Sequence, residues 1–412
     1  MKTTLQFFRI LGFSFLVVGN LIGVGILALP VNTGLAGLLP ALSAMLVLGG
    51  MMFFSALVLS REAVISRREN FNYPTLYEKY LGAAGKWVAI LANMLILYGL
   101  LVAYITGGTT ILANLFHLPE GFKWLLTIGF FAVITSVALM KTGLLVKYNS
   151  LIMLVLFVFF LLMTVIGEFN LDVENYEFND WSFLIATAPI IVTAFHFHNI
   201  IPNICSGLKW DFSAIWKSIL IGMVIGYGMN AVWIQVGIGV LPLEGSADSL
   251  LEAFHKNLPA TVPMSGIIGS SAFMLFSICF SLLAIMTSYL ANSMGLMGFI
   301  KDMTENHLNL KGRAVVVGAT FLPPLVISLV WPQIFLEAIN IVGGVGIVVL
   351  FGILPGIIYI RKADGGLKKG IGWAILIVFV LCLVFEIGQE AGLLHIQPHV
   401  EHYAPQVEHI RQ

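Results

Sequence analysis

The sequence predicts an all-α membrane protein that crosses the bilayer many times. Of its 412 residues, 59% are hydrophobic and only 10% are charged, whereas roughly a quarter of the residues of soluble globular domains are charged. So few charges could not cover the surface of a soluble domain of this size, and so apolar a chain does not remain disordered. Apolar runs long enough to cross a bilayer as helices recur along the whole sequence.

Eleven such runs can be distinguished. The first follows Lys2 and Arg9 as a signal peptide would, but it continues into a glycine-rich segment without a convincing cleavage site, so we expect it to remain as the first span. The largest loops are expected at about 61–86, 168–182 and 242–263. The expected spans cover about 10–35, 38–60, 87–115, 122–140, 148–167, 183–208, 212–241, 264–299, 313–331, 334–360 and 371–394.

The basic residues predict the orientation of these spans. With a cytoplasmic N-terminus and eleven crossings, eighteen of the 21 Lys and Arg residues fall inside, as the positive-inside rule expects. Only Lys123, Lys256 and Arg411 fall outside, together with the acidic loop from Glu168 to Asp180. The odd number of spans places a C-terminal tail, residues 395–412, in the periplasm.

Several function classes lack their signatures. Basic and acidic residues are equal at 21 each, so no excess of positive charge suggests a nucleic acid partner. There is no phosphate-binding loop for ATP and no Ser/His/Asp or H-E-x-x-H arrangement for an intramembrane enzyme. We expect no cofactor and no metal site, because packing explains the three cysteines and a solvated chain end explains the histidines of the tail. These residues are Cys205, Cys279, Cys382, His395, His399, His402 and His409.

The first span contains material that a continuous membrane helix would avoid. Gly19, Gly23 and Gly25 precede Pro30, and this combination weakens the helix at the depth of the membrane core. Unwound backbone is tolerated there only when it is buried in protein or lines a wet cavity. Close helix packing through Gly19 and Gly23 is the alternative explanation.

The sixth span contains a corresponding interruption. His196, His198 and Asn199 lie in apolar sequence, and Phe195 and Phe197 precede Pro202 by the same distances as Gly23 and Gly25 precede Pro30. Interrupted helices at matching positions indicate an inverted-repeat transporter with a central site. We therefore expect one domain, 1–394, with repeats at about 10–167 and 183–360 and an extra helix at about 371–394.

Broken helices suit a zwitterionic ligand. Freed amide groups attract an anionic group, and freed carbonyl groups attract a cation such as an ammonium group. An amino acid carries both, and aromatic side chains nearby could form a wall around it, although each could instead pack in the core or face lipid. The expected substrate-binding residues are Asn20, Ile22, Gly23, Val24, Gly25, Tyr98, Tyr104, Phe195, His196, Phe197, His198 and Asn199.

These segments also resemble a known family. The segment Asn20–Pro30 resembles the first helix of bacterial hydroxy- and aromatic-amino-acid permeases in the amino acid–polyamine–organocation superfamily, and the tyrosine- and tryptophan-specific permeases most of all. Further matches follow in the right order along the chain. They are Thr75–Gly82, Ala103–Gly107, Phe197-His198 with Pro202, and Thr320–Pro324.

The resemblance implies a leucine-transporter-like fold with two inverted five-helix repeats, broken helices one and six, and an eleventh helix. It also implies proton-coupled uptake of an aromatic amino acid, tyrosine or tryptophan, across the bacterial inner membrane by alternating access. In the family a small residue is expected where His196 stands. Thr287 and Ser288 match hydroxyl groups that help bind sodium in related sodium-coupled folds, whereas Leu282 stands where some tyrosine permeases have an acidic residue.

The sequence leaves the coupling group and the substrate open. Imidazole titrates near neutral pH, so His198 either carries the proton or hydrogen-bonds the substrate or a freed carbonyl group. Glu386 and Glu390 are expected at the membrane interface, outside the mechanism. The alternatives are a serine/threonine or other neutral amino acid symporter of the same family, coupled to sodium, and a channel, although no span carries the repeated polar face of a pore.

Overall fold

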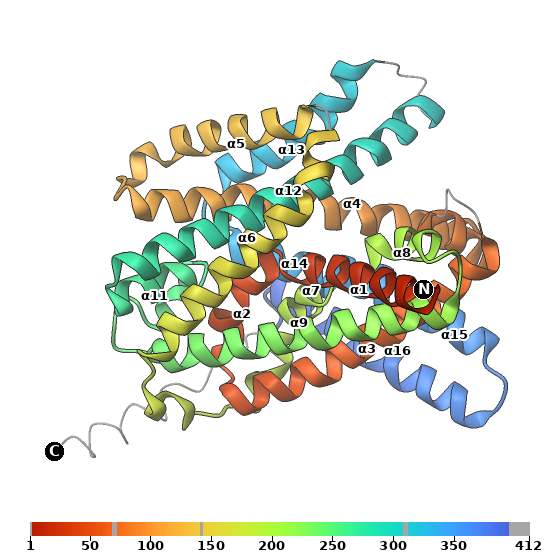
Figure 1. Ribbon diagram of the computed structural model, residues 1–412, viewed down its shortest axis with the longest axis horizontal. Coiled ribbons are helices and arrows are strands. Elements are labelled where there is room, and N and C mark those ends of the chain that lie inside the picture. Colours follow the sequence, from red (N-terminus) through yellow and green to blue (C-terminus); the bar gives the residue numbers. More distant parts are fainter. Residues whose placement is uncertain (1, 68–71, 141–142, 308–311, 395–412) are drawn as a thin grey trace.

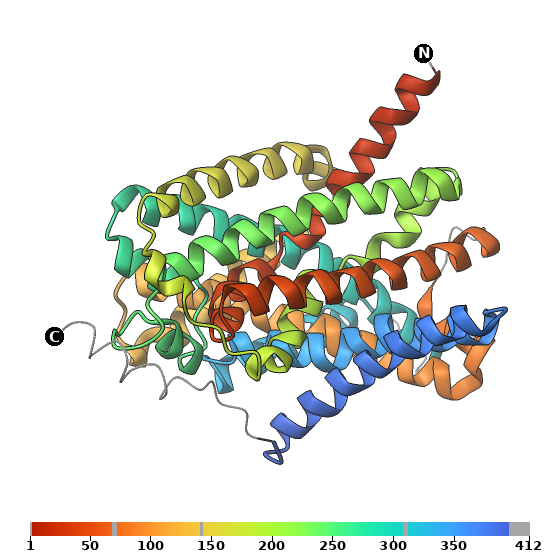
Figure 2. The same ribbon diagram turned by 90° about the horizontal axis from the view of Figure 1, so that it is seen from below.

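The computed structural model describes residues 2–67, 72–140, 143–307 and 312–394. Within these ranges the regular structure is helical, apart from one β-bridge between Gly37 and Asn179. Figures 1 and 2 show the long helices packed side by side in one bundle. The tail at 395–412, for which we predict a periplasmic location, lies outside the described residues.

Most of the helical elements are α-helices. The element η5 is a π-helix, and the other η elements are 3-10 helices. In chain order the elements are α1 Lys2–Leu21, α2 Val24–Gly34, α3 Leu38–Ser66, α4 Tyr73–Leu115, η1 Glu120–Phe122, α5 Lys123–Leu139, α6 Gly143–Glu168, η2 Val173–Tyr176, η3 Phe183–Thr187, α7 Ala188–Ala194, η4 His198–Ile200, α8 Ile201–Gly207, α9 Phe212–Val240, α10 Leu250–His255, α11 Thr261–Ile268, α12 Ser271–His307, α13 Arg313–Val330, α14 Phe335–Ile341, η5 Val342–Ile353, α15 Leu354–Lys362 and α16 Gly366–Glu390.

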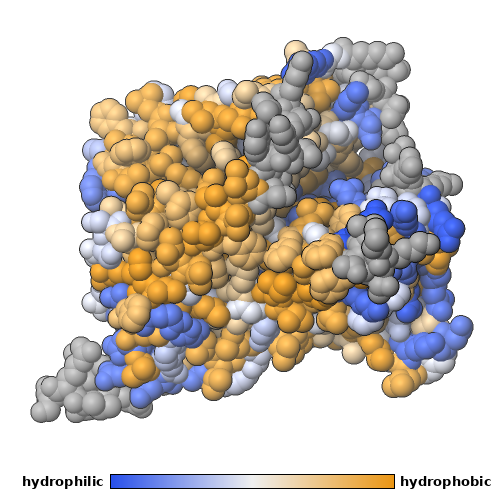
Figure 3. All heavy atoms as spheres, viewed as in Figure 1, coloured by the Kyte–Doolittle hydropathy of each residue, from blue (hydrophilic) through white to orange (hydrophobic). Residues whose placement is uncertain are grey.

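The predicted class, a helical protein with many membrane spans, is confirmed. In the described part of the chain, nine helical segments are long and apolar enough to cross a membrane, and the bent pair α1–α2 makes ten when it is counted as one span. Helix α5, at 17 residues, is apolar but shorter. Figure 3 shows hydrophobic residues across the middle of one face, with hydrophilic residues gathered towards both ends of the helices.

Two predicted boundaries are wrong. The segment 61–86 is mostly helical, because α4 already begins at Tyr73, where the side chain of Asn72 accepts a hydrogen bond from the Thr75 amide at 2.8 Å. The span expected at 264–299 is interrupted at Gly269, whose φ of 61° ends α11, and the long helix α12 starts only at Ser271. Hydropathy alone does not separate a short apolar helix from the span that follows it.

Helix α2 lies in the centre of the bundle. All residues from Leu21 to Gly34 are buried, and α2 packs against α7, α9, α10 and α12. Helix α9 approaches α1 and α2 closely through glycines, since a Cβ atom added at Gly222 would lie 2.6 Å from Cβ of Val17, and one at Gly237 would overlap Pro30. The rest of the bundle therefore holds the glycine-rich segment in place.

Basic side chains tie several helices together at one end of the bundle. Arg9 of α1 donates to the carbonyl oxygen of Gly207 at 3.3 Å. Lys362 of α15 forms an ion pair with the buried Glu62 of α3, and the hydroxyl group of Tyr80 in α4 donates to the same carboxylate at 2.6 Å. These contacts gather residues that the charge pattern assigns to the cytoplasmic side.

Candidate functional site

The first predicted interruption coincides with a break between α1 and α2. The two helices are bent by 55° and are separated by Ile22 and Gly23. The amide of Ile22 still bonds to the carbonyl oxygen of Val18 at 2.9 Å, whereas Gly23 is extended, with φ −112° and ψ −150°. Helix α2 therefore begins in the protein interior, with its first amide groups free of helical partners.

The second predicted interruption, in the sixth span, also coincides with a break. Helix α7 ends at Ala194, a 3-10 turn follows at His198–Ile200, and α8 starts at Ile201 with Pro202 in its first turn. Proline is tolerated there because the first amide groups of a helix have no partner within it. Phe195 and Phe197 lie between the helical pieces, and both are buried.

The two breaks meet in the centre of the molecule. A Cβ atom added at Gly25 would lie 3.0 Å from Cα of Ala194 and 3.2 Å from its nitrogen, so α2 touches the backbone at the end of α7. Gly25 thus serves close helix packing, a role that the sequence suggested as an alternative only for Gly19 and Gly23. Gly23 faces elsewhere, since a Cβ atom there would lie 3.2 Å from Oγ of Ser288.

Ser288 belongs to a small polar cluster on α12 and α4, together with Asn292 and Tyr104. The side-chain amide of Asn292 donates to the hydroxyl oxygen of Tyr104 and to the carbonyl oxygen of Ser288, both at 2.9 Å. Oδ1 of Asn292 is buried and has no hydrogen-bond partner among the described residues. This cluster faces the first break through Ser288, and it contains a buried acceptor without a partner among the described residues.

Sequence reasoning missed Asn292, although a signal was present. An asparagine inside a membrane span is costly and usually faces the protein interior, and Asn292 follows Ser288 by one helical turn. The hydroxyl group of Thr287 turns away, because it donates to the carbonyl oxygens of Leu283 and Ala284 in its own helix. Of the two expected hydroxyl groups, only that of Ser288 faces the break.

The two histidines form a second group, on the side of the sixth span that faces α3 and η5. Nε2 of His198 lies 3.2 Å from the carbonyl oxygen of Met52, which requires the proton to be on Nε2. The ring of Phe351 in η5 stacks on both imidazoles, with centroids 5.1 Å from His196 and 5.0 Å from His198. The hydroxyl group of Tyr73 donates to the backbone carbonyl of His198.

Three expected site residues do not join either group. The hydroxyl group of Tyr98 donates to the carbonyl oxygen of Ala319 in α13 at 2.7 Å. Asn20 bonds to the carbonyl oxygen of Leu16 in its own helix at 3.0 Å, and Asn199 is exposed. Their side chains therefore do not converge with the rest. Ile22, Val24, Phe195 and Phe197 are buried.

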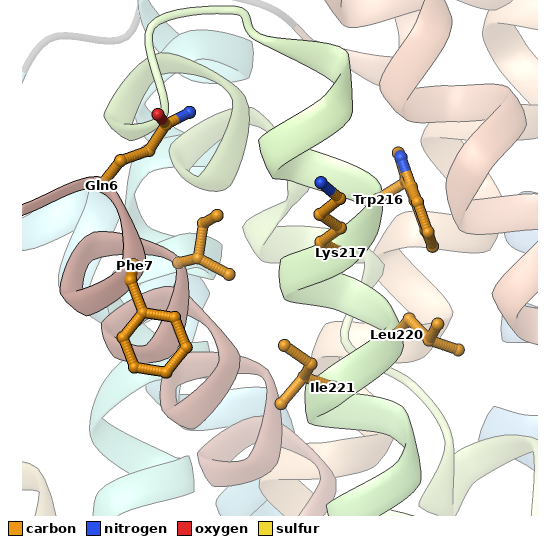
Figure 4. Close-up of a pocket in the computed structure, with 7 residues that line it drawn as sticks. Gln6, Phe7, Trp216, Lys217, Leu220 and Ile221 are labelled. Atoms are coloured by element: carbon orange, nitrogen blue, oxygen red, sulfur yellow. The ribbon is translucent and has the colours of Figure 1, made fainter. Parts of the chain in front are cut away.

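A surface hollow lies away from both breaks. It has a volume of about 400 Å³ and lies between the start of α1, at Gln6 and Phe7, and α9, at Trp216 and Lys217 (Figure 4). None of the expected substrate-binding residues lines it. Its lining is largely apolar, and it lacks the paired polar backbone groups that a zwitterion requires.

Comparisons with known proteins agree on one family. The model of the tryptophan/tyrosine permease family matches residues 8–388. The tyrosine-specific transport system 1 of Haemophilus influenzae is 30% identical to this chain over 343 residues, which cover 81% of this chain and 84% of the relative. The tryptophan-specific transport protein of Shigella flexneri is 25% identical over 94% of each chain.

A solved structure with a similar fold is that of a manganese transporter from Eremococcus coleocola. The TM-score is 0.62 at 12% sequence identity, and the match covers 98% of this chain and 91% of the other. At this identity the likeness concerns the fold alone. The helical bundle thus has the fold of a solved transporter.

Proposed function

Because the chain belongs to the tryptophan/tyrosine permease family, we propose that this multi-pass membrane transport protein imports an aromatic amino acid, tyrosine or tryptophan, by proton-coupled symport. It is a transport protein and not an enzyme. The proposed location is the bacterial inner membrane. The partners are the amino acid, the proton and the surrounding lipid.

The meeting of two helix breaks is the observation that carries the proposal. The start of α2 offers amide groups for the substrate carboxylate, and the end of α7 offers carbonyl groups for its ammonium group. Both sets belong to the backbone, and Gly25 keeps them close together. Substrate backbone groups are thus recognised without a charged side chain.

The polar cluster next to Gly23 is the proposed location of the substrate ring. The aromatic ring of Tyr104 lies 6.4 Å from that of Tyr289, and Oδ1 of Asn292 is free to accept a hydrogen bond. A tyrosine hydroxyl group or a tryptophan indole N–H is a donor that suits this acceptor. A ligand that lacks such a donor would leave Oδ1 of Asn292 unsatisfied, which costs about 1–3 kcal/mol.

The burial of the start of α2 is the reason for proposing alternating access. The start of α2 is enclosed, since every residue from Leu21 to Gly34 is buried. A substrate reaches this position only if helices on one side of the break separate and later close. The breaks between α1 and α2 and between α7 and α8 are natural hinges for such a motion.

His198 is assigned to the packing of the sixth span rather than to coupling. Its Nε2 proton is engaged with Met52, and a second proton on the ring would place a charge in a fully buried position. Among the described residues, its ring neighbours are His196, Phe197 and Phe351, none of which is an acid. The neutral ring is well suited to fix the sixth span against α3.

Uptake into proteoliposomes tests the proposed function. Labelled tyrosine, tryptophan, serine and threonine are offered while proton and sodium gradients are imposed separately. We expect accumulation of tyrosine or tryptophan with an inward proton gradient alone. Accumulation of serine or threonine instead would favour the alternative substrate within the family, and dependence on sodium alone would assign Ser288, beside Gly23, to a cation site and contradict proton coupling.

A further inference from the structure

The last membrane helix carries a buried carboxyl group that the proposed substrate site does not use. Glu386 of α16 is only 2% exposed, and its Oε1 has no hydrogen-bond partner in the described part of the chain. The sequence pattern predicts an interfacial position for it near the outer end of the last span, and the structure packs its side chain inside the bundle. A buried, unpartnered acid within a membrane span indicates a functional group.

Glu386 lies directly against the π-helix. If a Cβ atom were added at Gly344, it would lie 2.6 Å from Cγ and 2.9 Å from Cδ of Glu386, so only a glycine leaves room for this side chain. Stretches of π-helix are rare and frequently occur at functional sites. The carboxyl group thus packs on a segment whose geometry is itself unusual.

In the part of the chain that the structure describes, the elements that pack against α16 supply no counter-ion at Glu386. Helix α16 packs against η5, α15, η3 and α7, and η3, η5 and α7 contain no titratable side chain. On α15 the titratable groups are Tyr359, Arg361 and Lys362, and Lys362 pairs with Glu62. On α16 itself the titratable neighbours of Glu386 are Cys382, one turn before it, and Glu390, one turn after it, and Glu337 of α14 lies near Glu390.

The observed packing therefore belongs to the protonated side chain. An ionised carboxylate in this position would be a buried charge, close to a second acid and without a cation. Loss of the proton would drive the carboxylate away from Gly344 and towards water. Protonation and the docking of α16 on η5 are thereby linked.

The π-helix and its neighbour α14 connect Glu386 to the place where the two helix breaks meet. A Cβ atom at Gly343, next to Gly344, would overlap the carbonyl oxygen of Pro189 in α7, and the hydroxyl group of Thr193 donates to the carbonyl oxygen of Ile339 at 3.1 Å. The far end of α7, at Ala194, touches Gly25. A series of close contacts through η5, α14 and α7 therefore runs from the carboxyl group to the proposed substrate site.

We propose that Glu386 binds the coupled proton. The inference rests on the proposed proton symport and names its carrier. The carboxylate takes one proton from water on the side where substrate enters, docks α16 on η5 and so holds α7 in place for the substrate. The O–H bond breaks again when the opposite side opens, and the proton leaves to water there with the substrate.

The test compares Glu386→Gln with Glu390→Gln, a matched change at an exposed acid one turn away. Both variants and the wild type are placed in proteoliposomes. Proton-driven accumulation, substrate exchange without a gradient and substrate-linked proton uptake are then measured. We expect Glu386→Gln to exchange substrate normally but to lose accumulation, proton uptake and the pH dependence of transport. Glu390→Gln should keep accumulation and proton uptake, with a shifted pH dependence because the neighbouring negative charge is gone.

Substrate exchange by Glu386→Gln shows that this variant is folded. Glu386→Asp tests whether an acid is required at this position: because it keeps a carboxyl group, it should retain proton uptake with a shifted pH dependence. Normal accumulation and proton uptake in Glu386→Gln would overturn the proposal, and so would loss of exchange together with accumulation while Glu386→Asp is also inactive. If the wild type takes up tyrosine or tryptophan without moving protons, both the proposed proton symport and the role of Glu386 are contradicted. A proton-coupled wild type that Glu386→Gln leaves unchanged contradicts only the carrier.

Discussion

At the scale of single residues, the polar groups of the core determine what the transporter can bind. Many of them donate to backbone carbonyl groups, as His198 does to Met52 and Tyr73 does to His198, whereas eleven buried side-chain atoms of the described residues have no hydrogen-bond partner. Oδ1 of Asn292 and Oε1 of Glu386 have no partner in the described ranges, and we assign them to substrate and proton respectively. In this assignment α12 contributes a group that binds the substrate, and α16 contributes the group that binds the proton.

The role of His198 can be tested by His198→Gln. The glutamine amide can still donate to the carbonyl oxygen of Met52, so we expect the stability of the protein and its proton-driven accumulation to be retained. His198→Leu would lose this hydrogen bond and destabilise the protein by about 0.5–1.5 kcal/mol. Thermal unfolding and uptake in proteoliposomes are the two measurements.

A different result would reassign the proton. If His198→Gln exchanges substrate but no longer accumulates it, and the double variant with His196→Gly does the same, an imidazole carries the proton. Glu386 would then be a structural residue. The double variant is required because the ring of His196 lies 6.2 Å from that of His198 and could replace it.

At the scale of helices, the sequence predicted the breaks better than the contacts around them. Glycine and proline impose local backbone limits, so the interruptions near Gly23 and before Pro202 could be read directly. The direction of a side chain depends on which helix packs against it, and no local rule gives that. The sequence therefore could not show that Tyr98 bonds to Ala319 of α13 or that Glu386 packs against Gly344.

The contact between α2 and α7 predicts different results at the two glycines. Gly25→Val would place a branched side chain against Cα of Ala194 and force the helices apart, at a cost of about 1–3 kcal/mol in stability and with loss of uptake. Gly23→Ala has more room, because its nearest neighbour is the hydroxyl group of Ser288 at 3.2 Å. We expect this variant to remain stable but to bind substrate roughly tenfold more weakly, a change of about 1.4 kcal/mol.

Thermal unfolding and substrate binding to the purified variants separate the two effects. A Gly25→Val protein of normal stability and normal affinity would show that the helices do not depend on this contact. A Gly23→Ala protein with unchanged affinity would place the substrate away from the start of α2.

At the scale of the whole molecule, the charge pattern and the bundle support one orientation. Arg9, Lys362 and Glu62 join α1, α3, α8 and α15 at one end, which we assign to the cytoplasm. We predict a periplasmic C-terminus, so a reporter that is active only outside the cytoplasm should be active when it is fused after Gln412. An inactive reporter on a stable protein would mean an even number of spans and would contradict the proposed repeats.

The central claim is that an aromatic amino acid binds where the two broken helices meet. The most direct measurement is an experimental structure of the protein with tryptophan or tyrosine bound. We predict that the substrate carboxylate lies at the amide groups of the start of α2, with the ring beside Tyr104 and Asn292. A ligand found instead in the hollow between α1 and α9, with the break still closed by Gly25 against Ala194, would contradict this claim.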